Sequence, residues 1–287
     1  MKEKAEIEFE ILTPCFCAGN DPKGAEIRAT SIKGMMHWWY RALYGGFDDE
    51  RKIFGGIEIK DNEIKEKLSF KDRRSSIDIK ITDFIGDEEK NITENKITSI
   101  GPKYLLYGME GRCVIKKGNF KLTLKKKPLF NEAKELDDNF ILMFSLLFSL
   151  GSRSRKGFGS LWPKNIIIDG QRENIPENKV EFIDAIKSKV ISKDMKMKFI
   201  SQGEVSSKDA LNKIHDFLYQ KDRRQGNEKG DKDRIPSPLL FKVIKLENKY
   251  FPLLIVFKNQ IMNDPKKPKR KQVWDKIYAE MENLNDL

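Results

Sequence analysis

The segment 150–161 combines cations and glycines in a pattern suited to binding phosphate groups. Within this segment lie three glycines, Gly151, Gly157 and Gly159, and three basic residues, Arg153, Arg155 and Lys156. Glycine lets the backbone take left-handed conformations and present its N–H groups outward, and Arg and Lys add positive charge. We call this segment the glycine-rich turn. Its composition predicts contact with the phosphate backbone of a nucleic acid.

A purely structural interpretation of the glycine-rich turn is also open. The turn follows the apolar run Phe140 to Leu150, which predicts a buried helix within a longer helical segment, Asn131 to Leu150. Gly151 would then cap that helix, and the three cations would face solvent. The turn by itself does not decide between the two interpretations.

A second candidate surface is a predicted helix that begins at Thr30 or Ser31 and runs to Tyr44, before Gly45-Gly46. At about 100° per residue its side chains separate into two faces. The apolar face, predicted to pack in the core, holds Ile32, Met35, Met36, Trp38, Trp39, Ala42 and Leu43. The polar face holds Lys33, His37, Tyr40, Arg41 and Tyr44.

The polar face of this helix has the residue types of an RNA contact. Tyr40 and Tyr44 could stack on unpaired bases while Lys33 and Arg41 hold phosphates. Arg28 extends the basic patch toward the helix N-terminus, which itself favours anions. A helix face that is simply solvated is the alternative.

His37 raises the question of catalysis, because a histidine among cations could act as general acid or base in RNA cleavage. One histidine does not make a mechanism, since transesterification also needs a second proton-transfer group and a cation for the phosphorane. We therefore prefer phosphate or base contact for His37. His215 lies beside the apolar stripe of another predicted helix, and we expect it at a core boundary.

Composition favours a polyanionic partner, because 55 basic and 44 acidic residues give a formal charge of +11. No apolar run approaches the roughly 20 residues of a membrane span, and the charged N-terminus argues against a signal peptide. We expect a cytoplasmic location and no membrane partner. The three cysteines, Cys15, Cys17 and Cys113, predict neither a disulfide framework nor a zinc site.

Sequence motifs for nucleotide, cofactor or metal chemistry are not evident. The chain has no phosphate-binding loop of the nucleotide-hydrolase type and no dinucleotide-binding glycine motif, so no cofactor is expected. Asp48-Asp49-Glu50 is interpreted as a plain acidic turn.

The hydrophobic pattern predicts an α+β protein. Ala5, Ile7, Phe9 and Ile11 alternate with charged residues and predict a strand. Further strands are predicted at Ile77 to Thr82, Thr98 to Tyr107, Arg112 to Lys125 and Asn165 to Ile168. With the two helices, this order matches a ferredoxin-like domain over residues 1–170.

Residues 171–287 are predicted to form a second, degenerate ferredoxin-like domain. Its predicted elements are strands at Val180 to Ile183, Leu239 to Leu246 and Phe251 to Phe257, and helices at Ser207 to Gln220 and Lys271 to Asn283. Lys221 to Arg234 has no apolar residue and is expected to be a mobile loop. The segment Asn263 to Lys271, with its basic cluster from Lys266 to Lys271, is either a solvated linker or an RNA contact.

Taken in order, several short motifs resemble the RAMP superfamily of CRISPR proteins, and within it the first RAMP subunits of the Cmr effector complex of type III-B systems. The motifs are Thr13-Pro14, Glu26-Ile27-Arg28, Ser31-Ile32-Lys33-Gly34, Trp38-Trp39-Tyr40-Arg41-Ala42-Leu43, Ile53-Phe54-Gly55-Gly56 and the glycine-rich turn. The resemblance is specific over Phe9 to Gly56 and Phe140 to Pro163.

This resemblance implies two ferredoxin-like domains in a non-catalytic, RNA-binding subunit near the 3′ end of the guide RNA. Its expected partners are guide or target RNA and the other Cmr subunits. The residues it places toward RNA are Arg28, Lys33, His37, Arg41, Arg153, Arg155 and Lys156. His37 departs from the arginine usual at that position, so a metal-independent endoribonuclease that uses His37 is the alternative function.

Overall fold

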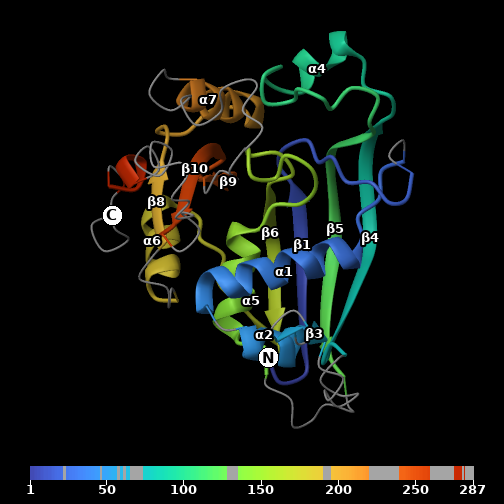
Figure 1. Cartoon of the computed structure of the whole chain (residues 1–287). Helices are drawn as coiled ribbons and strands as arrows, with labels where there is room; N and C mark the ends of the chain where they lie inside the picture. Colours follow the sequence, from blue (N-terminus) through green and yellow to red (C-terminus); the bar gives the residue numbers. More distant parts are fainter. Residues whose placement is uncertain are drawn as a thin grey trace.

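A computed structural model gives the arrangement of most of the chain. It describes residues 1–21, 24–45, 47–56, 59–60, 63–64, 74–127, 135–189, 195–219, 239–258, 275–279 and 281. The structure is a mixed α+β protein with antiparallel sheets (Figure 1).

The larger sheet has the strand order β4-β5-β1-β6-β7, and every neighbouring pair is antiparallel. Its strands are β1 (Lys4–Ile11), β4 (Ile77–Glu89), β5 (Val114–Lys126), β6 (Leu161–Ile168) and β7 (Gln171–Arg172). The alternation in β1 explains its central place, because Ile7 and Phe9 are fully buried while Glu8 is exposed.

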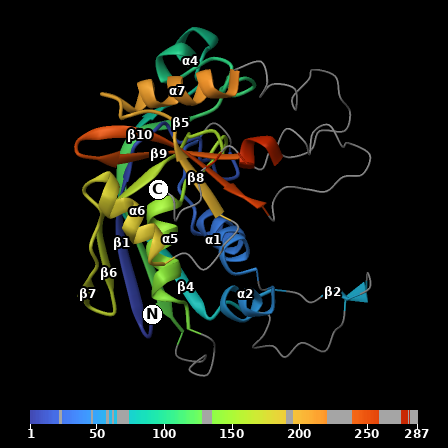
Figure 2. The ribbon, with the colours of Figure 1, turned by 90° about the vertical axis from the view of Figure 1, so that its left-hand side faces the viewer.

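Helices α1 (Ala29–Tyr44) and α5 (Asp138–Leu147) cover one face of this sheet (Figure 2). Between helices and sheet lies an aromatic core, in which Phe148 stacks on Phe144 at a 4.3 Å ring separation and meets Phe9 of β1 edge-on. The opposite face carries paired charges such as Lys121 and Glu6, 2.8 Å apart. The sheet is therefore apolar on one side and polar on the other.

The second part of the chain forms a smaller antiparallel sheet of order β8-β10-β9. Its elements are α6 (Lys179–Lys187), β8 (Met195–Phe199), α7 (Ser207–Tyr219), β9 (Leu239–Leu246) and β10 (Lys249–Phe257). The described residues 275–279 are helical, within the helix predicted from Lys271 to Asn283.

Four shorter elements complete the described structure. They are α2 (Phe47–Phe54), β2 (Ile59–Lys60), β3 (Glu63–Ile64) and α4 (Glu94–Ile100). Helix α2 follows α1 directly, and β2 pairs with β3. In Figures 1 and 2, α4 lies beside α7 at one end of the molecule, and α2 lies at the other.

Two strand predictions are wrong. Val180 to Ile183 belongs to helix α6, where Phe182 and Ile186 share one buried face at the helical spacing of four residues. Thr98 to Tyr107 comprises the end of α4 and a series of turns, since its apolar residues pack irregularly under the loop. Strand β8, whose Met and Lys residues alternate, was not predicted.

Several predictions lie wholly or partly outside the described residues, among them the helix from Lys271 to Asn283, which is described over 275–279 and at 281. The loop Lys221 to Arg234 and the basic segment Asn263 to Lys271 are entirely outside them. The helix predicted from Asn131 to Leu150 is described from residue 135 and is helical only over Asp138–Leu147. Among the described residues, no helix has both the length and the apolar character needed to cross a membrane.

Candidate nucleic-acid interface

The glycine-rich turn is not a helix cap. Helix α5 ends at Leu147 with Phe148 as its C-cap, and the chain runs extended before it reaches Gly151. All three glycines of the turn have positive φ, 88° at Gly151, 87° at Gly157 and 60° at Gly159. The predicted need for left-handed backbone is therefore confirmed, and the capping alternative is wrong.

The turn is held by hydrogen bonds within the protein. The N–H groups of Ser152 and Gly159 donate to the carbonyl oxygens of Phe16 and Pro14, each over 2.9 Å. The N–H of Lys156 donates to the Arg153 carbonyl oxygen over 2.8 Å. The expectation that the turn presents its N–H groups outward is therefore wrong for these amides, because they already have partners. These three N–H groups are therefore not available to an anion.

Strand β9 holds the turn from the side of the smaller sheet. The N–H of Phe241 donates to the Arg155 carbonyl oxygen over 3.0 Å. The Lys242 Nζ donates to the carbonyl oxygens of Phe148 and Leu161, over 2.5 and 2.6 Å, at the two ends of the turn. Burial lowers the pKa of the Lys242 amino group well below its ordinary value. The turn thus lies where the two sheets meet.

The three cations of the turn lie partly buried on its outer side. The guanidinium of Arg155 lies over the ring of Trp38 from α1, 5.7 Å from its centre, and burial lowers the pKa of Arg155. Arg153 donates to the Tyr107 carbonyl oxygen, and Lys156 lies over the Tyr104 ring. These three contacts orient the cations, and none of the three is an ion pair.

Arg153 and Arg155 have charge to offer a ligand. No carboxylate among the described residues pairs with either guanidinium, and the Nε atom of each is buried without a hydrogen-bond partner there. Because each Nε lies beneath the surface, a phosphate would have to approach the terminal nitrogens of the guanidinium. These two side chains are the best-suited anion ligands of the seven predicted residues.

The first turn of α1 adjoins the glycine-rich turn. Ser31 and Met35 line a pocket of about 450 Å³ together with Gly151, Ser152 and the exposed Arg112. The helix begins one to two residues earlier than predicted, at Ala29, and its N-cap residue is Arg28 rather than a serine or threonine.

Arg28 and Lys33 provide positive charge along α1. Arg28 is exposed at the N-cap, and Lys33 is half-buried. Burial and the neighbouring Lys127 lower the pKa of Lys33. Neither residue lines the pocket formed by Ser31, Met35 and the start of the glycine-rich turn.

His37 and Arg41 have an internal partner. The Glu50 carboxylate of α2 lies 2.5 Å from His37 Nδ1 and accepts a hydrogen bond from Arg41 over 2.7 Å. The Glu50 side chain is only 6% exposed. The interpretation of Asp48-Asp49-Glu50 as a plain acidic turn is therefore wrong, because this segment lies in a helix whose buried carboxylate joins α2 to α1.

The two tyrosines of α1 do not form a base-stacking surface. Tyr40 is buried and stacks on Tyr44 at 4.8 Å, with Phe54 and Phe140 beside it. Burial, followed by the charge of Asp49, raises the pKa of Tyr40 to about 12. The prediction fails because α1 packs against α2 and α5 as well as against the sheet.

Several residues of this interface carry no recognisable sequence signal. Trp38 was assigned to the core, and it does pack on Trp39 and Phe257, but it also supports Arg155. Arg112 and Tyr104 approach the turn only because α4 and the loop after it fold back over it. Sequence spacing does not indicate such contacts.

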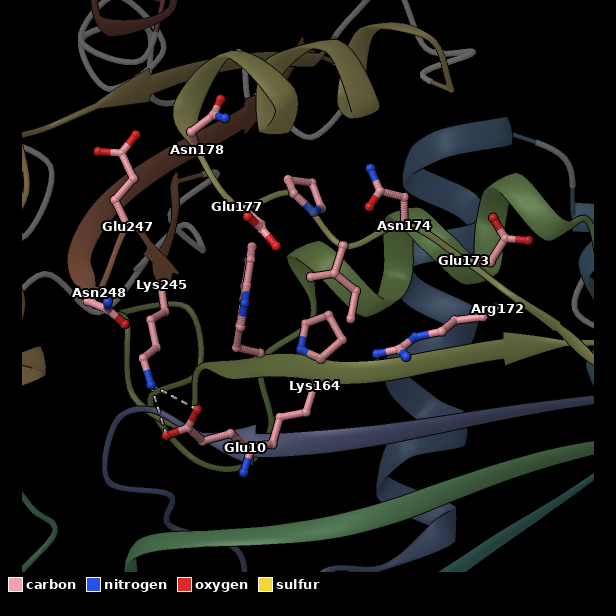
Figure 3. A pocket seen from close by; sticks show the side chains of 14 residues that line it. Glu10, Lys164, Arg172, Glu173, Asn174, Glu177, Asn178, Lys245, Glu247 and Asn248 are labelled. Atoms are coloured by element: carbon pink, nitrogen blue, oxygen red, sulfur yellow. Dashed lines mark hydrogen bonds and ion pairs between the residues drawn. The ribbon is translucent and has the colours of Figure 1, made fainter.

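A pocket of about 980 Å³ lies elsewhere and holds none of the predicted residues (Figure 3). Glu10 and Lys245 form an ion pair at its rim, with 3.2 Å between Nζ and Oε2. Glu173, Glu177 and Glu247 add negative charge. This mixture does not favour a polyanion. No group of three His, Cys, Asp or Glu side chains suited to a metal ion occurs in the described part of the chain.

Comparison with known protein families shows which family the chain belongs to. The sequence pattern of the RAMP superfamily matches residues 8–162, just over half of the chain and the part that contains α1 and the glycine-rich turn. The chain belongs to the RAMP superfamily. The resemblance inferred from the short motifs is thereby confirmed.

Two curated proteins of Pyrococcus furiosus are similar to this RAMP chain. The CRISPR system Cmr subunit Cmr1-2 is 38% identical over 66 residues, which cover 20% of this chain and 35% of that protein. The CRISPR system Cmr subunit Cmr1-1 is 29% identical over 148 residues, which cover 47% of this chain and 40% of that protein. The chain therefore aligns with less than half the length of these relatives.

Solved structures share the fold of this RAMP chain at low sequence identity. The crystal structure of Cmr1 from Pyrococcus furiosus in its apo form has a TM-score of 0.60 and 19% identity, covering 88% of this chain and 87% of that chain. A chain of the type III-B Cmr-beta complex bound to cognate target RNA has a TM-score of 0.52 and 12% identity, with 97% and 99% covered.

Proposed function

We propose that this RAMP chain is a non-catalytic, RNA-binding subunit of a Cmr effector complex that silences invading RNA. It contacts guide or target RNA near the 3′ end of the guide. The observation that carries the proposal is the pair of partly buried guanidinium groups, Arg153 and Arg155, without a carboxylate partner among the described residues. The similarity to Cmr subunits supports the proposal that the chain assembles into a Cmr complex.

We also propose that the chain comprises two ferredoxin-like domains, 1–170 and 171–287, the second degenerate. The order β4-β5-β1-β6 supports the first, because it is the antiparallel order of a strand-helix-strand-strand-helix-strand unit. The order β8-β10-β9, with α7 after β8, supports the second and corresponds to the same plan without a fourth strand in the described residues. The glycine-rich turn would then lie at the junction.

A structural role for His37 supports the non-catalytic assignment. Its Nδ1 is bonded to Glu50, and its ring lies 5.0 Å from that of Phe54. The other histidine, His215, is on α7, which lies at the opposite end of the molecule from α2 in Figures 1 and 2. The two histidines therefore do not form an acid–base pair.

The central test removes the three cations of the turn. The triple substitution Arg153→Ala, Arg155→Ala and Lys156→Ala should weaken RNA binding for all sequences alike, and the slope of log K against log salt should fall by about 0.7 for each lost phosphate contact. A matched control removes three exposed lysines from the open face of the sheet: Lys117, Lys125 and Lys164. Equal losses in both variants would contradict the assignment of the turn.

A second experiment distinguishes binding from cleavage. The purified chain is incubated with CRISPR repeat RNA in EDTA, beside the His37→Ala variant. We expect intact RNA in both samples. Cutting that depends on His37 would overturn the non-catalytic assignment. Co-purification with other Cmr subunits and bound RNA tests the assembly, since a scaffold that contacts only proteins would recover subunits but bind no RNA by itself.

A further inference from the structure

A group of exposed aromatic side chains lies next to the glycine-rich turn. Tyr104, Tyr107 and Tyr219 are 41%, 77% and 47% exposed, respectively, although large apolar side chains are mostly buried in this protein. Tyr104 and Tyr107 come from the loop after α4, and Tyr219 ends α7. Together with His215 of α7 they form what we call the tyrosine platform.

Three members of the platform, Tyr104, His215 and Tyr219, are ordered by contacts with one another. The rings of His215 and Tyr219 stack at a centre separation of 5.1 Å with an interplanar angle of 30°. Tyr104 meets both of them edge-on, at 6.0 Å from His215 and 5.9 Å from Tyr219. Residues more than 100 positions apart in the sequence are thus assembled into one aromatic surface whose outer side faces solvent.

Below the platform the packing is tight. Ile214 and Leu211 of α7 are fully buried, and a Cβ atom on Gly157 of the turn would lie 2.6 Å from Ile214 Cδ1. Phe158 is also fully buried and lies against Gly101 at the end of α4. The platform therefore rests on the glycine-rich turn, and its position relative to the turn is set by the core.

Two cations of the turn connect it to the platform. Lys156 Nζ lies 5.7 Å from the ring centre of Tyr104, and Arg153 donates a hydrogen bond to the Tyr107 carbonyl oxygen. Two acidic residues at this end have cationic or polar neighbours: Asp216 lies 3.2 Å from His215 Nδ1, and Glu94 pairs with Lys103. Aromatic faces and phosphate-binding cations are therefore adjacent.

We propose that the tyrosine platform binds an unpaired nucleobase of the same RNA strand whose phosphates contact the glycine-rich turn. This inference rests on the proposed function and specifies the ligand: single-stranded RNA rather than a duplex. Every base has an aromatic face, so the contact is tolerant of sequence. Base stacking beside a cation that holds the adjoining phosphate is the arrangement used to bind single strands.

Charge and exposure favour this occupant over a protein partner. The platform combines aromatic faces with positive side chains of the turn in a chain of formal charge +11. A protein-docking patch would be expected to contain aliphatic side chains at its centre, whereas the exposed apolar members of the platform itself are tyrosines.

The test compares Tyr104→Leu with Tyr104→Phe in the full chain, using a short unstructured RNA labelled for fluorescence anisotropy. Loss of the ring should weaken binding by about 5- to 30-fold, whereas Phe keeps the aromatic face and should bind within about twofold of the original chain. The salt slope should not change in either variant, because no phosphate contact is removed. Phe84→Leu, an exposed aromatic residue on β4, is the matched control.

A second readout detects the stacked base itself. RNAs with 2-aminopurine at successive positions should show quenching at one position on binding, and Tyr104→Leu should abolish it. Thermal unfolding verifies that each variant is folded. If Tyr219→Leu is also folded, it should give the same loss.

The outcomes separate this inference from the proposed function. If the triple cation variant loses binding while Tyr104→Leu binds RNA normally and retains the quenching, the platform is not a base site and RNA binding by the turn stands. If neither variant affects RNA binding, the proposed function itself fails. If Tyr104→Leu leaves RNA binding unchanged but loses co-purifying Cmr subunits, the platform binds protein and the inference is overturned.

Discussion

The guanidinium of Arg155 lies over the indole ring of Trp38, 5.7 Å from the ring centre. This contact joins the glycine-rich turn to helix α1. It holds a partly buried cation, whose pKa is lowered by burial, in a fixed direction without a carboxylate. A preoriented guanidinium loses less conformational entropy when it binds a phosphate.

Replacing Trp38 should therefore weaken RNA binding without removing a charge. Cation–π contacts contribute about 0.5–2 kcal/mol, so Trp38→Leu should lower affinity by at most about 2- to 30-fold, and Trp38→Phe by less. Fluorescence anisotropy at fixed salt measures the effect. Trp38 also packs on Phe257, so the comparison requires variants that remain folded at the assay temperature. A folded Trp38→Leu variant with unchanged affinity would show that the contact does not orient Arg155.

Glu50 should contribute more to the free energy of unfolding than Asp49, its neighbour on α2. Glu50→Gln removes the charge that accepts from His37 and Arg41 and should lower the free energy of unfolding by about 1–3 kcal/mol. Asp49→Asn is the matched control on the same helix and should cost less than half as much, because Asp49 is more exposed. Urea unfolding measures both. Similar costs would indicate that the Glu50 contacts contribute little.

Lys242 should make stability rise with pH. Burial lowers its pKa in the folded protein below the ordinary 10.5, so unfolding takes up a proton at pH values between these two. Over that range stability increases as pH rises toward 10.5 and is lost as pH falls. As pH rises toward 10.5, the original chain should gain stability relative to Lys242→Met, and unfolding at a series of pH values measures the difference.

A neighbouring lysine supplies the control for this pH effect. Lys245 lies on the same strand as Lys242, and Lys245→Met removes a partly exposed amine that pairs with Glu10 of β1. This variant should keep the rise in unfolding free energy with pH, because Lys242 is still present. If Lys242→Met and the original chain respond to pH in the same way, the Lys242 amine is not titrating between the folded and unfolded states.

Replacing a glycine of the turn by alanine should cost more stability than replacing a glycine outside it. A Cβ at Gly159 would lie 1.8 Å from the Leu150 carbonyl oxygen, whereas a Cβ at Gly170 would meet nothing within 4 Å. Both have positive φ, 60° and 85°. Gly170→Ala should cost about 1–2 kcal/mol from backbone strain alone, and Gly159→Ala should exceed about 3 kcal/mol. Equal shifts in the thermal midpoint would mean that the backbone moves aside at Gly159.

Elements with a strong local pattern could be predicted from the sequence. The alternation around Ile7 and the apolar stripe around Met36 each identify an element, because burial on one face imposes a period on the chain. The segment that begins at Val180 shows where such prediction fails. Its four residues fit a strand or one turn of a helix equally well. Phe182 and Ile186 indicate a helix only once both are known to face the core.

The sequence by itself determined the family, the central strand and helix, and the left-handed backbone of the glycine-rich turn, since each depends on residues close together in the chain. The tertiary structure alone decided which cations are available to a ligand. His37 and Arg41 contact Glu50, while Arg153 and Arg155 have no carboxylate among the described residues. Whether a charge is neutralised depends on groups brought close in space by folding, and a local sequence pattern does not indicate them.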